Sequence, residues 1–182
     1  MDALGVLDLS AETVALDATL YDSRILQFTL TGDMALRAGW GREPQFVLAI
    51  GGFHPRFAAP PGLPALRRLA LCLADGNTLQ LRCEAYLAVT SNTVQFGARV
   101  DIHAAGGGFS FDGMLGFDAI IQLAPLAFEV EVGAALALRY HGRLLMGITF
   151  QGRLAGPTPW QVEGKAKIKF LFFSVSVSFS RT

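Results

Sequence analysis

Strict alternation of apolar and polar residues is the feature that most restricts what this chain can fold into. From Thr13 to Thr182 large apolar residues recur at every second position, and helical spacing is almost absent. The segment Arg82–Asp101, RCEAYLAVTSNTVQFGARVD, is typical of this pattern. Because successive side chains of a strand point to opposite faces, the pattern predicts about ten strands with one apolar face.

The gaps between these segments are short and carry Gly, Asn or Pro, which makes them too short for parallel crossovers. We therefore predict an all-β fold, an antiparallel meander of about ten long strands with one apolar face. Such a sheet closes as a barrel or folds over as a sandwich or trough, since its apolar face needs a cover.

Residues 1–182 are interpreted as a single β domain, and the length also fits a fragment of a longer chain. Residues 51–66 interrupt the alternation with GGFHPRFAAPPGLP, where prolines cannot donate to a strand ladder. This stretch is predicted to be an irregular Pro/Gly-rich connection or a lid.

Strand register follows from matching apolar residues across each turn. A two-residue turn at Ser91-Asn92 sets Leu87 opposite Phe96 and Glu84 opposite Arg99. Pairing Ile102 with Phe109, and then placing a four-residue loop at 124–127 and a three-residue loop at 141–143, extends the same matching. The result is two predicted cross-strand charge ladders, Glu84–Arg99–Asp112–Arg139 and Glu131–Arg153–Glu163.

The last strand changes its pattern near Phe172, because apolar residues move from even to odd positions up to Phe179. We expect a bulge there, or a passage from one layer to another.

No catalytic, cofactor or metal site is predicted. His54, His103 and His141 lie in different segments, with no acidic or Cys partner at metal-ligand spacing. Cys72 and Cys83 are expected on opposite faces, so a disulfide is not expected and the compartment is reducing. We find no nucleophile elbow and no phosphate loop, and therefore expect no enzyme activity.

Fifteen basic and fifteen acidic residues cancel, so the chain has no electrostatic reason to bind nucleic acid or an anionic membrane. No signal peptide begins at Met1, which favours a cytoplasmic location, with export by a non-classical route as the alternative. The sequence contains no uninterrupted apolar run of about 18 residues, so no transmembrane helix is predicted.

Three segments carry a family resemblance: GGFHPRF, FSFDGMLGFDAIIQLAPLAFEVEV and GPTPWQVEGKAKIKFLFFSVSVSFS. Over Phe46 to Phe179 the chain resembles an uncharacterised bacterial domain-of-unknown-function family of large β-rich proteins, some encoded near contractile injection systems. The resemblance implies bacterial origin and a place in a longer polypeptide, and it implies no catalytic residues.

Three functions are compatible with these observations. The first is a non-enzymatic structural or scaffold β domain of a larger bacterial assembly, which self-associates or joins neighbouring β domains through its sheet edges. The second is a binding or transport module that holds a lipid or other apolar ligand inside the curled sheet, and the third is an outer-membrane β-barrel. The candidate lining of an apolar ligand site is Leu87, Phe96, Phe111, Phe117, Phe128, Leu136, Ile148 and Phe150.

Overall fold

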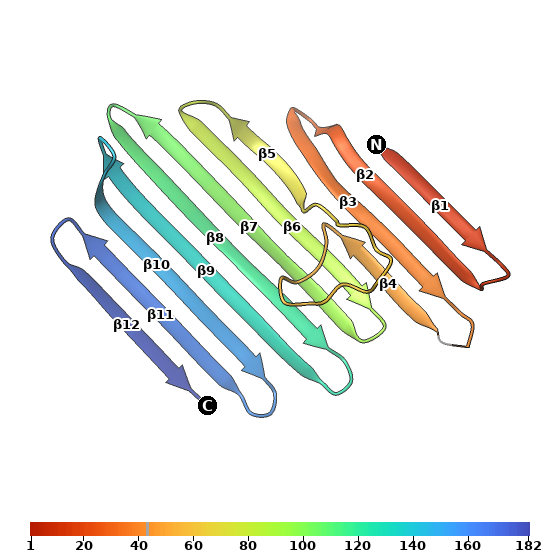
Figure 1. The fold of residues 1–182 in the computed structure, drawn as a ribbon. Coiled ribbons are helices and arrows are strands. Elements are labelled where there is room, and N and C mark those ends of the chain that lie inside the picture. Colours follow the sequence, from red (N-terminus) through yellow and green to blue (C-terminus); the bar gives the residue numbers. More distant parts are fainter. Residues whose placement is uncertain (43) are drawn as a thin grey trace.

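The computed structural model describes residues 1–42 and 44–182, without the side chain of Asp22, and consists of twelve antiparallel strands in one sheet (Figure 1). In the described part of the chain, no helix has the length and hydropathy needed to cross a membrane. The strands are β1 (Asp2–Asp8), β2 (Thr13–Ile25), β3 (Phe28–Gly39), β4 (Gln45–Ile50), β5 (Leu69–Asp75), β6 (Leu79–Thr90), β7 (Thr93–Gly106), β8 (Phe109–Gln122), β9 (Ala127–Tyr140), β10 (Arg143–Gly156), β11 (Gln161–Phe170) and β12 (Ser174–Arg181).

The strands follow one another across the sheet in sequence order, from β1 at one edge to β12 at the other (Figure 1). The exception is the space between β3 and β6, which β4 and β5 share end to end. Strand β3 pairs with β4 through Met34–Gly39 and with β5 through Thr29–Thr31. The all-β antiparallel meander predicted from the sequence is confirmed.

Residues 51–68 leave the sheet between β4 and β5 and pass over one face as an irregular segment, which we call the lid (Figure 1). The exit is at Gly51, whose φ of 71° lies in the left-handed region. Its N–H donates to the Asp33 carbonyl at 2.8 Å, and Asp33 N–H donates to the Arg67 carbonyl at 3.2 Å. Strand β3 therefore keeps hydrogen-bonded partners where the lid departs and returns.

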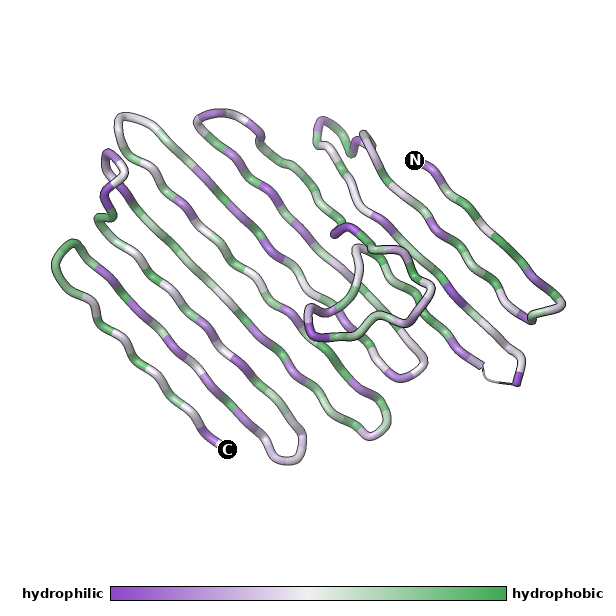
Figure 2. Tube along the Cα trace, viewed as in Figure 1, coloured by the Kyte–Doolittle hydropathy of each residue, from purple (hydrophilic) through white to green (hydrophobic). Residues whose placement is uncertain are grey.

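The sheet has two chemically different faces, visible as alternating colours along most strands (Figure 2). The apolar face carries Leu87, its register partner Phe96, and the residues in phase with them. The polar face carries Glu84, its partner Arg99, and the residues in phase with these. This alternation confirms the predicted division of the chain into two faces.

Burial is concentrated on the polar face, because the lid lies over it. Ala49, Ala88 and Gln95 of that face are each 0% exposed. On the apolar face Leu87 is 41% exposed and Phe96 is 37% exposed. The apolar face is therefore the more open one in this chain.

The register of the hairpin β6–β7 agrees with the prediction at every rung that we named. Leu87 lies opposite Phe96 and Glu84 opposite Arg99, and the same register sets Arg82 opposite Asp101. The two-residue turn Ser91-Asn92 is correct as well.

The next two hairpins are shifted from the predicted register. Strand β7 extends to Gly106, so a tight Gly107-Gly108 turn sets His103, and not Arg99, opposite Asp112. Both turn glycines have positive φ, 60° and 81°, which a two-residue hairpin of type I′ requires. The β8–β9 loop is Leu123–Leu126, one residue earlier than predicted, which sets Arg139 opposite Ser110.

In the β9–β10 hairpin a shorter turn is offset by a shift of register within the strands. Its turn has two residues, His141-Gly142, where three were predicted, and a register shift between Leu144 and Met146 restores the expected pairing. Glu131 therefore lies opposite Arg153, as predicted, and Arg153 lies opposite Glu163.

The C-terminal change of pattern arises from a chain reversal and not from a bulge. Phe170 N–H donates to the Phe173 carbonyl at 2.8 Å, and β12 then runs back along β11. Ile168 lies opposite Val175, so both sets of apolar residues share the apolar face. Because Asp2–Asp8 also forms a strand, the sheet has twelve strands and not about ten.

Candidate functional site

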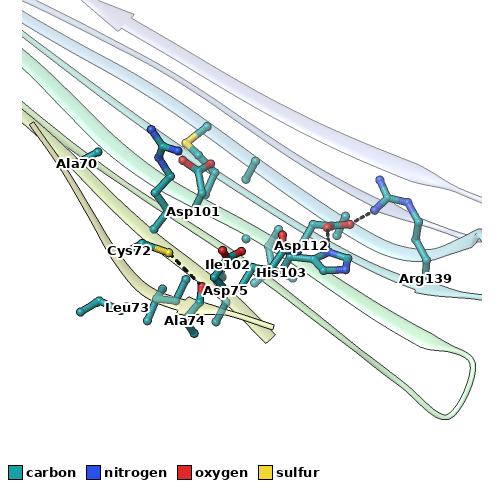
Figure 3. A pocket seen from close by; sticks show the side chains of 18 of the residues that line it. Ala70, Cys72, Leu73, Ala74, Asp75, Asp101, Ile102, His103, Asp112 and Arg139 are labelled. Carbon is teal, nitrogen blue, oxygen red and sulfur yellow. Dashed lines mark hydrogen bonds and ion pairs between the residues drawn. The ribbon is translucent and has the colours of Figure 1, made fainter. Parts of the chain in front are cut away.

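An open groove of about 1270 Å³ lies on the polar face, and we call it the polar groove (Figure 3). Strand β3 and the strands from β5 to β11 contribute to its wall. One row of successive register partners crosses the whole groove: Thr29, Cys72, Arg82, Asp101, Met114, Ala135, Thr149 and Lys167. At about 4.8 Å per strand this row is roughly 34 Å long, so the polar face must be concave for both ends to line one groove.

A charged cluster lies in the middle of this groove. His103 Nδ1 lies 2.6 Å from Asp112 Oδ1, and the Arg139 guanidinium contacts the other carboxylate oxygen of Asp112 (Figure 3). The hydrogen bond from His103 and the charge of Arg139 lower the pKa of Asp112 below its usual range. Asp112 is therefore a compensated carboxylate and not a free acid or base.

Two further charge pairs with members of the first predicted ladder form along one strand, and not across strands as the ladder required. Arg82 contacts Glu84 at 2.8 Å, and Arg99 contacts Asp101 at 2.7 Å. The predicted ladder from Glu84 to Arg139 is therefore wrong in its middle rung, because Arg99 lies opposite Gly116 and not opposite Asp112. Asp112 and Arg139 do form an ion pair, although from diagonal positions and not from directly opposite ones.

Two carboxylates under the lid join it to the sheet. Arg56 of the lid contacts Glu129 and lies 3.0 Å from Glu131. Arg153 donates to Glu129 at 2.8 Å and lies 3.8 Å from Glu163. The second predicted ladder thus has the correct register, and of its charges Arg153 contacts Glu163 while Glu131 contacts the lid through Arg56.

His54 lies at the deepest point of the lid, where only 2% of the residue is exposed. Its backbone N–H donates to Gln95 Oε1 at 2.9 Å, and its Nδ1 accepts the Arg56 N–H at 3.2 Å. Burial lowers the pKa of His54, so the imidazole is neutral at pH 7. This histidine is part of the folded core and is not available as a surface base.

A second contact of the lid involves Tyr86, which is 6% exposed. The Arg68 guanidinium lies 3.9 Å from the ring centroid, and the hydroxyl donates to Asp118 Oδ1 at 2.8 Å. The ring reaches Asp118 across Gly97, where a Cβ would lie 2.4 Å from Tyr86 Cε1. Burial and the Asp118 carboxylate raise the pKa of the Tyr86 hydroxyl, which therefore stays protonated.

Metal and disulfide chemistry have little support in this chain. Within residues 1–42 and 44–182, no group of three His, Cys, Asp or Glu could hold a metal ion. Cys72 and Cys83 are free, and their register partners Arg82 and Val100 lie on opposite faces. The placement of the two cysteines on opposite faces agrees with the prediction.

The residues proposed from the sequence as an apolar lining all lie in phase on the apolar face, away from most of the polar groove. Leu136 nevertheless contributes to the wall of the polar groove, and Phe117 to a smaller cavity of about 480 Å³ beside the lid. Five of the eight are substantially exposed: Leu87, Phe96, Phe117, Ile148 and Phe150.

Sequence reasoning did not single out the lysines at one end of the groove. All three lysines of the chain, Lys165, Lys167 and Lys169, alternate along β11 and project from the polar face. Lys167 and Lys169 line the polar groove. Their alternation on a single strand is visible in the sequence and could have indicated this charged rim.

Comparison with known proteins gives one match. Residues 1–182 match the model of a family described as "Family of unknown function (DUF6603)". No curated protein and no solved structure matches the chain.

Proposed function

The chain therefore belongs to the DUF6603 family, whose function is unknown, and from this premise we propose that it is a structural β module that joins neighbouring β segments through its edges. The observation that carries the proposal is the pair of edge strands. Every residue of β1 and of β12 is exposed, and the strand order ends at these two strands. An edge strand presents unpaired N–H and C=O groups that template further pairing.

The apolar face supports the same proposal. It carries exposed Phe and Leu side chains across many strands, and an apolar surface of this kind is covered in assemblies. Joining more strands to the edges would extend the sheet and allow this face to meet another layer. Bacterial origin and a link to contractile injection systems are further parts of the proposal, and they rest on the sequence resemblance.

Strand directions restrict how identical copies could join. β4 and β5 share one position, so the twelve strands occupy eleven positions, and β1 and β12 run in the same direction (Figure 1). Antiparallel pairing that keeps the apolar faces of two copies on the same side of the joined sheet therefore requires like edges, for example β12 with β12 about a two-fold axis. Light scattering over a concentration series should accordingly show dimers before larger species.

Two double variants of β12 test the role of the edge. Val175→Lys with Val177→Lys puts charges on the apolar face, and Ser176→Lys with Ser178→Lys puts the same charges on the polar face. Association through the edge should weaken in both variants, since charges on an edge strand oppose pairing. Weakening by the valine variant alone would assign association to the apolar face, and a strictly monomeric wild type at high concentration would also contradict the proposal.

A further inference from the structure

We propose that the polar groove binds an elongated anionic amphiphile, with its anionic group at Lys167 and Lys169 and its uncharged body along the uncharged floor that β10, β9 and β8 form beside these lysines. Fatty-acid carboxylates and alkyl or lysolipid phosphates share this chemistry. The site is independent of the edge pairing proposed above.

The first step of the argument is charge. Within the described residues, the lysines of β11 take part in none of the ion pairs. The register partners of Lys167 are Thr149 on β10 and Ser176 on β12, and those of Lys169 are Gly147 and Ser174. Two exposed ammonium groups thus stand at one end of the groove beside four uncharged register partners, three of which carry a hydroxyl.

The second step is the compensation of the other charges in the groove. Asp101 is paired with Arg99, Asp112 with His103 and Arg139, and Arg82 with Glu84. Asp75 contributes a carboxylate at the opposite end, on β5. The field along the groove therefore runs from positive at β11 to negative at β5, which orients an anion toward the lysines.

The third step is the floor between the two ends. Next to the lysines it is formed by Gly147 and Thr149 on β10, and by Ala135 and Ala137 on β9. Met114 follows on β8. These side chains are small or flexible and uncharged, so they leave room for an apolar chain and offer it contact.

The experiment measures binding of dodecanoate and dodecyl phosphate by calorimetry below their micelle concentrations, using the whole chain. Both should bind at one site, and dodecyltrimethylammonium, with the opposite charge, should bind at least about tenfold more weakly. Inorganic phosphate alone should bind still more weakly. If it bound as well as dodecyl phosphate, the apolar body would be irrelevant and the proposal would be overturned.

The variant Lys167→Ser with Lys169→Ser should lower the affinity for both anions by about tenfold or more. The matched control is Lys165→Ser with Arg181→Ser, which removes the same net charge from β11 and β12 at positions outside the groove wall. The control should change affinity by less than about twofold. Equal losses in both variants would indicate general charge attraction, and no loss in either would place the amphiphile on the apolar face; both results overturn the proposal.

A variant without a charge change provides an independent check. Ala137→Trp places a large side chain on the floor of the groove at a half-buried position. The circular dichroism spectrum and the thermal midpoint of the variant verify that it is folded. It should abolish binding of both anions, and unchanged binding in the folded variant would overturn the proposal.

Discussion

Replacing Gly51 by Ala should destabilise the fold far more than the same change at Gly62, although both glycines have positive φ, 71° and 81°. A Cβ at Gly51 would lie 2.5 Å from the Ala85 carbonyl oxygen and 2.7 Å from the Leu69 N. Both neighbours are backbone atoms of the sheet, so they cannot move aside as a flexible side chain would. A Cβ at Gly62 meets nothing within 4 Å.

The two substitutions share the cost of left-handed backbone, about 1–2 kcal/mol, and the gain of about 0.4–1 kcal/mol from a less flexible unfolded chain. Gly62→Ala should therefore lower the free energy of unfolding by about 0–1.5 kcal/mol. Gly51→Ala adds overpacking worth about 1–3 kcal/mol, for a total of about 1–4.5 kcal/mol. At about 2–4 °C per kcal/mol, its Tm should fall by roughly 2–18 °C.

Urea unfolding followed by the fluorescence of Trp40 and Trp160 measures both variants under the same conditions. The difference between Gly51→Ala and Gly62→Ala is the quantity of interest, because the backbone cost cancels. A difference below about 1 kcal/mol would refute the reasoning, since it would mean that the lid leaves the sheet without a close backbone approach.

Three further predictions concern the polar face. Tyr86→Phe should lower the free energy of unfolding by about 1.5–3 kcal/mol, because it removes the hydrogen bond to ionised Asp118, and an unchanged urea midpoint would contradict that contact. The hydrogen bonds from Arg67 lower the pKa of Asp33 to about 2, so this contact stabilises the fold above pH 4 and is lost as the pH falls toward 2. Asp33→Asn should remove about 1–2 kcal/mol of this pH-dependent stability, a value that is reduced because Arg67 is exposed to solvent. Unfolding curves of both proteins at pH 5 and pH 2.5 should measure the difference. Burial lowers the pKa of His54, so the unfolded state takes up the proton first and the free energy of unfolding falls as the pH drops below about 6.5. His54→Gln should flatten the plot of unfolding free energy against pH between pH 7 and pH 5. An unchanged slope of that plot would count against a buried neutral imidazole.

Alternation along the chain was sufficient to predict the fold class and the face of nearly every residue, but not the register of every hairpin. Asp112 illustrates the reason: its partner is His103 and not Arg99, yet Asp112 remains on the polar face. A shift by an even number of residues preserves the face of each side chain, so face-matching alone cannot detect it. The Ser91-Asn92 turn was predicted correctly because apolar matching left one good register, whereas Gly107-Gly108 allowed several.

The candidate site depends on contacts that alternation does not encode. Lys167 and Thr29 line one groove although they lie far apart in the sequence, and that requires a curved sheet. Titratable side chains such as His103 interact with partners on neighbouring strands. These partners can be identified only when the strand register is known.

The sequence by itself determined that the chain forms antiparallel strands with one apolar and one polar face. The reason is that even-numbered and odd-numbered side chains of one strand point to opposite faces of the sheet. Only the tertiary structure decided which face is concave and where burial occurs. The lid accounts for the burial, because His54 and Arg56 bond to residues of the polar face, so that the lid covers this face and leaves the apolar one open. Such long-range hydrogen bonds and ion pairs depend on where an irregular segment returns to the sheet, and a local pattern of hydropathy carries no information about that return.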